Sequence, residues 1–285
     1  MRVLVTTDGS ERSLRALPHA AAFARATGSQ LTLARVLDPL LDLADQPGLS
    51  LEAAAKSAMP GWQSAIAAIL AKTGVDGDAL VIRKARGEDI WETVLRAAEE
   101  TGASLIAMDS RGAGAIRHAL FGSVALDLVA HTELPIMVTG PSIQPPAPRE
   151  SYRIVATSDG SPASLAVVRA LGPLLETGCV DVTLLRLCWP AGPDHSAEDC
   201  AAQLKKLRQA LPGSERVNEE VRELMLIDGA APAIISVSEE LGASALAVAT
   251  HGHSAAYHLF GGSTALGIVE RSPLPVILCR SIKPV

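Results

Sequence analysis

The same arrangement of residues occurs twice along this chain of 285 residues. Each half opens with a short apolar run that ends in Asp-Gly-Ser, at residues 3–10 and 154–161. Each half later contains Gly-x9-Gly-Ser, at residues 112–123 and 252–263, followed by Leu-Pro and a last apolar run. Two copies of the same sequence pattern should adopt the same fold, so we expect two similar domains of ordinary size.

The spacing of the two copies defines the domain boundaries. Equivalent residues differ by 151 at the Asp-Gly-Ser turns and by 140 at the Gly-Ser pairs, so the first half carries 11 additional residues between these points. We place this insertion in residues 38–60. We expect a first domain at residues 1–140, a stiff Pro-rich linker at 141–150 and a second domain at 151–285.

Hydrophobic periodicity predicts five strands that alternate with helices in each half. In the first half the strands are expected at residues 2–6, 30–37, 79–83, 103–108 and 134–138, and the helices at 11–27, 62–72, 90–100 and 123–131. Pro18 predicts a bend in the first helix, and Gly28 predicts its end. This alternation is typical of a parallel sheet with helices on both faces, which binds ligands beyond the carboxyl ends of its strands.

Composition and charge exclude several classes of protein. The net charge is −6 without a basic half, which argues against binding to nucleic acid or to anionic membranes. Apolar residues make up 48% and charged residues 20%, as in a globular protein. No apolar run approaches the ~18 residues of a membrane span, and the first run is too short for a signal peptide. We expect a cytosolic protein.

The cysteines and histidines do not form a recognisable metal site. The four cysteines lack the close pairing of zinc and redox motifs, and we expect all of them to be buried, reduced thiols: Cys179, Cys188, Cys200 and Cys279. The spacing of His251, His253 and His258 fits no zinc pattern, so no metal centre is expected there. His251 is instead a candidate polar neighbour of a phosphate group.

The glycine-rich stretches have two interpretations. Each Gly-Ser pair precedes a helical pattern, and a helix N-terminus offers backbone N–H groups and partial positive charge to a phosphate. Alternatively, the glycines form tight turns and the serines only cap helices. The same choice applies to Asp8 and Asp159, which either contact a nucleotide or metal ion or cap the helix that follows.

Together, the Asp-Gly-Ser turns, the Gly-x9-Gly-Ser stretches and the Leu-Pro endings resemble the universal stress protein family over nearly the whole chain. The resemblance implies an α/β fold of two tandem Rossmann-like domains of the adenine nucleotide alpha hydrolase-like type. Each is then a five-stranded parallel sheet of order 3-2-1-4-5 with helices on both faces. It also implies an adenine nucleotide ligand, with ATP first, and a homodimer. The last strands at 136–138 and 276–278 are either ordinary buried strands or sheet edges that cover each other by antiparallel pairing within the chain, which we expect.

The resemblance assigns nucleotide contacts to matching positions in both halves. In the first half these are Thr6, Thr7, Asp8, Val36, Met108, Asp109, Gly112, Gly122, Ser123 and Val124. In the second half they are Thr157, Ser158, Asp159, Leu187, Val248, Ala249, Gly252, Gly262, Ser263 and Thr264. Val36 and Leu187 are expected against the adenine and the glycines around the phosphates. Arg111 and His251 are further polar candidates.

Both halves depart from the family pattern at its first glycine, which is Asp109 in one and Ala249 in the other. A methyl group there costs roughly 1–2 kcal/mol if the backbone needs glycine. A carboxylate ~4 Å from a phosphate repels it by about 4 kcal/mol at an effective dielectric of ~20, or ~1000-fold in affinity. We therefore expect the second half to bind better, unless Mg²⁺ shared with Asp8, or the charge of Arg111, offsets Asp109.

Three functions remain open at this point. The chain is a stress-response protein regulated by an adenine nucleotide, an adaptor with two degenerate sites, or a weak ATP hydrolase, for which no catalytic base or nucleophile is identifiable. Two structural features are equally open. Trp189 lies either over an adenine or in the core, and residues 38–60 form either a lid over the first site or an irregular excursion.

Overall fold

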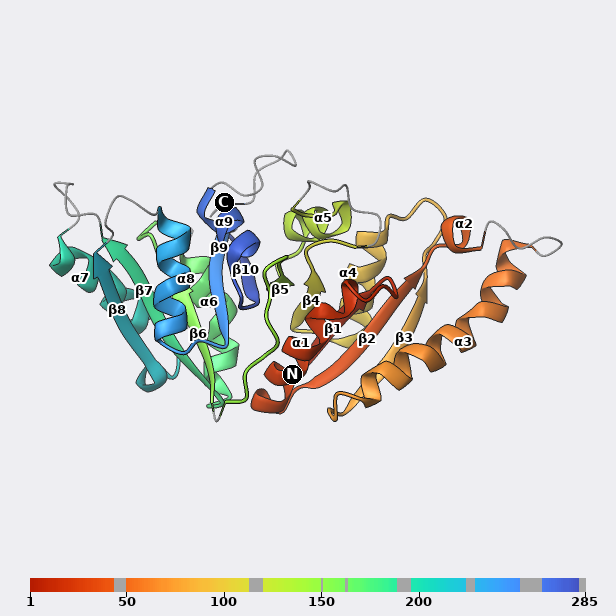
Figure 1. The fold of residues 1–285 in the computed structure, drawn as a ribbon, viewed down its shortest axis with the longest axis horizontal. Helices are drawn as coiled ribbons and strands as arrows, with labels where there is room; N and C mark the ends of the chain where they lie inside the picture. Colours follow the sequence, from red (N-terminus) through yellow and green to blue (C-terminus); the bar gives the residue numbers. More distant parts are fainter. Residues whose placement is uncertain are drawn as a thin grey trace. The chain divides into compact units, whose positions relative to one another are not determined.

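The computed structural model describes residues 1–43, 50–112, 120–149, 151–161, 164–188, 196–223, 229–251 and 263–281. The chain divides into two compact units, Met1–Leu128 and Val129–Val285 (Figure 1). In the described residues no helix is long and apolar enough to cross a membrane.

The first unit contains four parallel strands in the order β3-β2-β1-β4. They are β1 (Arg2–Thr7), β2 (Gln30–Leu37), β3 (Gly77–Arg83) and β4 (Leu105–Asp109). Between them lie a 3-10 turn η1 (Ser13–Arg15) and the helices α1 (Ala16–Thr27), α2 (Pro39–Asp42), α3 (Leu51–Ala71) and α4 (Ile90–Thr101), and α5 (Ser123–His131) follows β4. Apolar residues fill both faces of the central strands, because helices cover both faces of a parallel sheet.

The start of α1 differs from the sequence prediction. The helix begins at Ala16 after the 3-10 turn, so Pro18 stands in its first turn rather than in its interior. No carbonyl lies four residues earlier within the helix for Pro18 to displace, and the predicted bend has no cause. Gly28 ends the helix in the left-handed conformation at φ 65°, as predicted.

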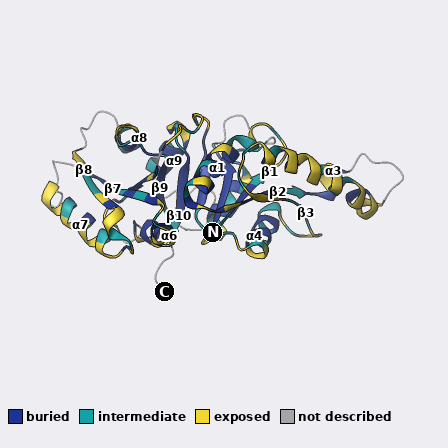
Figure 2. Cartoon of the chain, turned by 90° about the horizontal axis from the view of Figure 1, so that it is seen from below, coloured by how far each residue is buried: buried dark blue, intermediate teal, exposed yellow. Residues whose placement is uncertain are grey.

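The described parts of residues 38–60 are mainly helical, so they are not the irregular connection that the sequence suggested. Asp38 caps the short α2, and Ser50 caps α3 by accepting the N–H of Ala53 at 3.2 Å. The helix α3 is 21 residues long and includes Pro60 in its interior. Its alanine-rich first half favours helix strongly enough to outweigh the one hydrogen bond that the proline cannot donate. Residues 44–49 lie outside the described residues. Most of α3 faces solvent (Figure 2).

The described residues of the second unit form six strands. They are β5 (Ile136–Thr139), β6 (Tyr152–Thr157), β7 (Val180–Cys188), β8 (Val217–Glu223), β9 (Ala245–His251) and β10 (Val276–Ser281). The connecting elements are α6 (Leu165–Glu176), α7 (Ala197–Gln209), η3 (Ser214–Arg216), α8 (Ala230–Glu240) and α9 (Ser263–Arg271). The parallel order β8-β7-β6-β9-β10 is the predicted 3-2-1-4-5.

The last strands of the two sequence repeats, β5 and β10, pair antiparallel with Met137 opposite Ile277, as the sequence predicts.

The insertion in the first half lies between its second and third strands. Equivalent positions differ by 150 at the starts of β2 and β7 and by 140 at the starts of β3 and β8. The longer α3, with 21 residues against 13 in α7, holds much of it.

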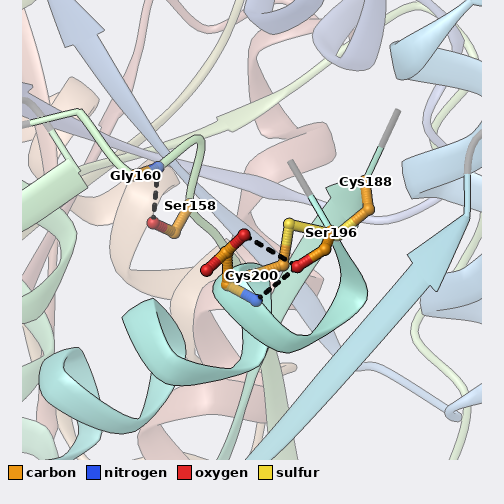
Figure 3. The surroundings of a disulfide bond; sticks show 6 residues. Ser158, Gly160, Cys188, Ser196 and Cys200 are labelled. Carbon is orange, nitrogen blue, oxygen red and sulfur yellow. Dashed lines mark hydrogen bonds between the residues drawn. A yellow bond between two sulfur atoms is a disulfide. The ribbon is translucent and has the colours of Figure 1, made fainter. Parts of the chain in front are cut away.

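The prediction of four buried, reduced cysteines is wrong for three of them. Cys188 at the end of β7 and Cys200 in α7 form a disulfide, with their Cα atoms 6.6 Å apart (Figure 3). Cys179 is exposed, and only Cys279 is a buried thiol, whose pKa burial raises to about 12. The pairing follows from α7 packing back against β7, which no local spacing of cysteines reveals.

Candidate functional site

A cavity of about 430 Å³ lies at the carboxyl ends of the four strands in the first unit. All eleven residues that the sequence proposed in this half line it: Thr6, Thr7, Asp8, Val36, Met108, Asp109, Arg111, Gly112, Gly122, Ser123 and Val124. They come from four segments of the chain, at residues 6–8, 36, 108–112 and 122–124, and meet because parallel strands end at one edge of the sheet.

One part of the cavity wall is apolar and includes residues that the sequence analysis missed. Ile90, Val94 and Ala97 of α4 line it together with Ile82 at the end of β3 and Leu41 of α2. The spacing of the three α4 residues indicates one helical face, but periodicity does not say whether that face meets the sheet or a crevice. These side chains form a surface suited to a flat apolar group.

The turn after β1 holds Asp8 in a fixed position. The Thr7 and Ser13 hydroxyls lie 2.7 Å apart, and Gly9 N–H donates to Thr7 Oγ1 at 3.0 Å. Ser10 N–H donates to Asp8 Oδ1 at 2.9 Å, so the carboxylate closes the turn that precedes the helix. Its other oxygen, Oδ2, would be 2.8 Å from a Cβ built on Gly112. Asp8 therefore both shapes its own turn and borders the glycine loop.

The glycine loop brings its two ends together at the start of α5. Gly122 N–H donates to the Ser110 carbonyl oxygen at 2.8 Å, and Leu126 N–H donates to the Gly122 carbonyl in the first turn of the helix. A Cβ on Gly122 would be 3.8 Å from Gly112 N. Residues 113–119 lie outside the described residues. The two glycines thus meet beside a helix N-terminus, the kind of position that suits an anion.

Asp109 is buried in this loop and its charge is partly balanced. Its side chain is 2% exposed, Oδ1 accepts Arg111 N–H at 3.1 Å, and Oδ2 lies 3.9 Å from Arg15 Nε. An opposite charge at this distance offsets repulsion between the carboxylate and a phosphate. The penalty expected for Asp109 from the sequence alone is therefore reduced.

Arg35 adds a cation to the same cavity. Its guanidinium carbon lies 3.6 Å from the centre of the Trp62 ring of α3. A Cβ on Gly9 would be 2.8 Å from Arg35 Nη1, and the φ of Gly9 is 88°. Glycine at this turn leaves the space that the arginine occupies.

In the second unit the candidate residues that the structure describes again lie towards the carboxyl ends of parallel strands. The rest of this candidate site lies outside the described residues. Thr157 ends β6, Leu187 is the penultimate residue of β7, and Val248 and Ala249 lie towards the end of β9. Since β7 and β9 both pair with β6 in parallel, their carboxyl ends share one edge. Thr264 stands at the start of α9.

The loop itself and several side chains of the second unit are outside what the structure describes. They are Gly252, Gly262, the side chains of His251 and Ser263, and also Trp189, His253 and His258.

Asp159 is the equivalent of Asp8 and makes similar contacts. Its Oδ1 accepts Ser161 N–H at 2.9 Å and the Ser164 hydroxyl at 2.8 Å. Burial raises the pKa of this carboxyl group, but the hydrogen bonds from Ser161 and Ser164 outweigh burial, and the net pKa is lowered. The residue is therefore ionised at neutral pH. Among the described residues no group of three or more metal-ligating side chains occurs.

The fold and this edge define an α/β protein with a ligand crevice beyond its parallel strands. The model of the universal stress protein family matches residues 1–140 and 151–280. The chain belongs to this family.

The chain is similar to known universal stress proteins in sequence and in structure. A universal stress protein of Thermus aquaticus is 30% identical over 136 residues, which cover 48% of this chain and 96% of that protein. One of Mycobacterium tuberculosis is 29% identical over 192 residues, 62% of this chain, and the match spans 59% of that protein's length. A universal stress protein from Archaeoglobus fulgidus has a TM-score of 0.66 at 17% identity, covering 99% of this chain and 97% of its own, and so shares the fold.

Proposed function

We propose that this universal stress protein binds an adenine nucleotide, ATP in the first place, as a regulatory ligand in at least one of its halves. The observation that carries the proposal is that eleven positions chosen from the sequence line a single cavity in the first unit. Its volume of about 430 Å³ is within the range of cavities that hold small organic ligands.

The two parts of the cavity suit the two parts of a nucleotide. Val36, Ile82 and Val94 supply an apolar surface for a base, and the glycine loop lies at the polar end with Arg111 and Ser123. Burying a flat base against apolar side chains is favourable by roughly 25 cal/mol per Å². Backbone N–H groups and one arginine at a helix start would hold the phosphates.

We propose further that the second half binds more tightly than the first. Ala249 places no charge where the first half has Asp109. Because Arg15 lies 3.9 Å from Asp109, the difference between the halves is smaller than the ~1000-fold that an uncompensated carboxylate would cause. Mg²⁺ bridging Asp8 and the phosphates belongs to the same proposal, since Asp8 Oδ2 borders Gly112.

The proposed role is regulatory: nucleotide occupancy changes the partners or assembly of a cytoplasmic, homodimeric stress protein. The substitutions at Asp109 and Ala249 favour a second candidate, an adaptor that needs no nucleotide. A hydrolase is the weakest candidate because the sequence identifies no catalytic base, nucleophile or second-substrate site.

Equilibrium dialysis of the full chain with ATP, ADP, AMP and cyclic AMP, with and without Mg²⁺, tests the proposal. Val94→Phe should fill the apolar part of the cavity and weaken nucleotide binding in the first unit at least about tenfold. Leu40→Phe, at a position 64% exposed and outside the lining, is the matched control. Equal binding by wild type and Val94→Phe at both sites would remove the first unit from the proposal.

A further inference from the structure

The Arg186 side chain is buried in the second unit, with part of its guanidinium unpaired among the described residues. The residue, in β7, is 5% exposed, and neither Nε nor Nη1 has a partner among the described residues. A buried charge without a counter-charge or hydrogen bonds is strongly destabilising, so natural proteins pair such groups.

The group is directed at the Asp-Gly-Ser turn that follows β6. A Cβ on Gly160 would clash with Arg186 Nη1 and with Gln203 Oε1 of α7. Gly160 has a φ of 78°, and its N–H donates to Ser158 Oγ at 3.2 Å (Figure 3). The unpaired cation therefore lies at the turn that carries Asp159, at the edge where the contacts of the second half are expected.

The equivalent arginine of the first unit has a partner that Arg186 lacks among the described residues. Arg35 occupies the equivalent position, 151 residues earlier, and it likewise lies against the glycine of its turn. The ring of Trp62 stacks on the Arg35 guanidinium at 3.6 Å. In the second unit the helix residue at this place is Gln203, whose Oε1 is also without a hydrogen-bond partner in the described residues. Arg35 is stacked on the tryptophan of α3, whereas neither Nε nor Nη1 of Arg186 has a hydrogen-bond partner in the described residues.

The disulfide fixes the wall that holds this group. Cys188 lies two residues after Arg186 and so on the same side of β7, and Cys200 lies three residues before Gln203 and so on the same side of α7. The bond between them ties the end of the strand to the first turn of the helix (Figure 3). Both sulfur-bearing residues are at most 2% exposed.

We propose that Arg186 is an oxyanion-binding residue that holds a phosphoryl group at the Gly160 turn, and that the Cys188–Cys200 disulfide positions it. A guanidinium offers two parallel N–H donors to phosphate oxygens, a pairing stronger than a neutral hydrogen bond. Inorganic phosphate and the phosphates of a nucleotide share this chemistry. The nucleotide alternative rests on the proposed function, and the phosphate alternative does not.

Isothermal titration calorimetry of the full chain with inorganic phosphate and, separately, with ATP tests the assignment. Arg186→Met should weaken the phosphate-binding event about 10- to 100-fold. Arg169→Met, an exposed position on α6 with the same loss of charge, should leave it unchanged. Because the variant replaces an unpaired buried charge by an apolar side chain, its melting temperature without phosphate should equal or exceed that of wild type.

The outcomes separate this inference from the proposed function. Phosphate binding that Arg186→Met abolishes, without any ATP binding, supports the oxyanion site and refutes the nucleotide. The inference is overturned if wild type and Arg186→Met bind ATP with equal affinity and no phosphate binding depends on Arg186. That result leaves the nucleotide proposal standing. A melting temperature well below that of wild type in Arg186→Met would show a structural role and would also overturn it.

Reduction tests the role of the disulfide. A dithiol such as dithiothreitol transfers two electrons and two protons to Cys188 and Cys200, giving two thiols and a cyclic disulfide of the reagent. The reduced protein, and the double variant Cys188→Ser with Cys200→Ser, should bind phosphate at least about threefold more weakly. Unchanged affinity in the folded, reduced protein would refute the positioning role.

Discussion

Replacing Asp109 by Asn should strengthen nucleotide binding in the first unit. The substitution removes one negative charge from the glycine loop and keeps the shape of the side chain. Asn can still accept Arg111 N–H through its amide oxygen, so the turn should persist. The loss of the contact with Arg15, whose side chain is 30% exposed, should lower the free energy of unfolding by less than ~1 kcal/mol.

The size of the gain follows from two opposed charge interactions. A carboxylate ~4 Å from a phosphate repels it by about 4 kcal/mol at an effective dielectric of ~20. Arg15, 3.9 Å from Asp109, cancels part of that field in the wild type. We therefore expect a gain of about 1–2 kcal/mol, or roughly tenfold in affinity, and a smaller gain at high salt.

Amide hydrogen exchange of residues 105–112, followed as a function of ATP concentration, reports the first unit separately from the second. Asp76→Asn removes the same charge just before β3, at the opposite edge of the sheet, and should leave the affinity as in wild type. An Asp109→Asn protein that binds ATP equally or more weakly than wild type would refute the view that this carboxylate faces the phosphates.

Three further predictions concern stability and reactivity. Gly77→Ala places a Cβ against a backbone carbonyl of β2 and should lower the stability of the first unit by about 2–3 kcal/mol in urea unfolding. Glu88, whose pKa the Arg96 ion pair lowers to about 2, stabilises the fold fully above pH 4.5 and loses this effect as pH falls towards 2; Glu88→Gln should cost about 1–2 kcal/mol at pH 7. Iodoacetamide at neutral pH should label Cys179 in the native, unreduced protein and Cys279 only after unfolding.

Each of these predictions has a matched control or a contrary outcome. Gly61→Ala in α3 meets no atom within 4 Å and should be neutral or slightly stabilising, so equal effects of the two glycine changes would contradict the steric argument. A stability difference between wild type and Glu88→Gln that persists at pH 2 would contradict the ion-pair assignment. Labelling of both free cysteines in the native state would contradict the burial of Cys279.

The strands and the edge of the sheet could be predicted because their signals are local. Runs such as Val3 to Val5 alternate with helical patterns, and glycines such as Gly28 and Gly102 adopt φ angles near 65° that mark helix ends. Parallel strands must end at one edge, so the predicted lining residues of the first unit were identifiable without coordinates. The individual residues were assigned by the resemblance to the universal stress protein family.

What the sequence did not reveal depends on packing between elements. The face of α4 that carries Val94 is a cavity wall because of how the helix lies on β1 and β2, which periodicity does not determine. Pro60 suggested a break in a segment where helix propensity and the Ser50 cap prevail. The contact of Cys188 with Cys200 arises from α7 folding back on β7, and the contact of Arg186 with the Gly160 turn arises from the pairing of β7 with β6.

Equilibrium dialysis of the purified full chain against labelled ATP, with and without Mg²⁺, tests the central claim most directly. The account predicts saturable binding of between about one and two nucleotides per chain, with the Val94→Phe variant losing the part that belongs to the first unit. The absence of any binding at ~1 mM ATP, in both conditions, would contradict it and would favour the adaptor.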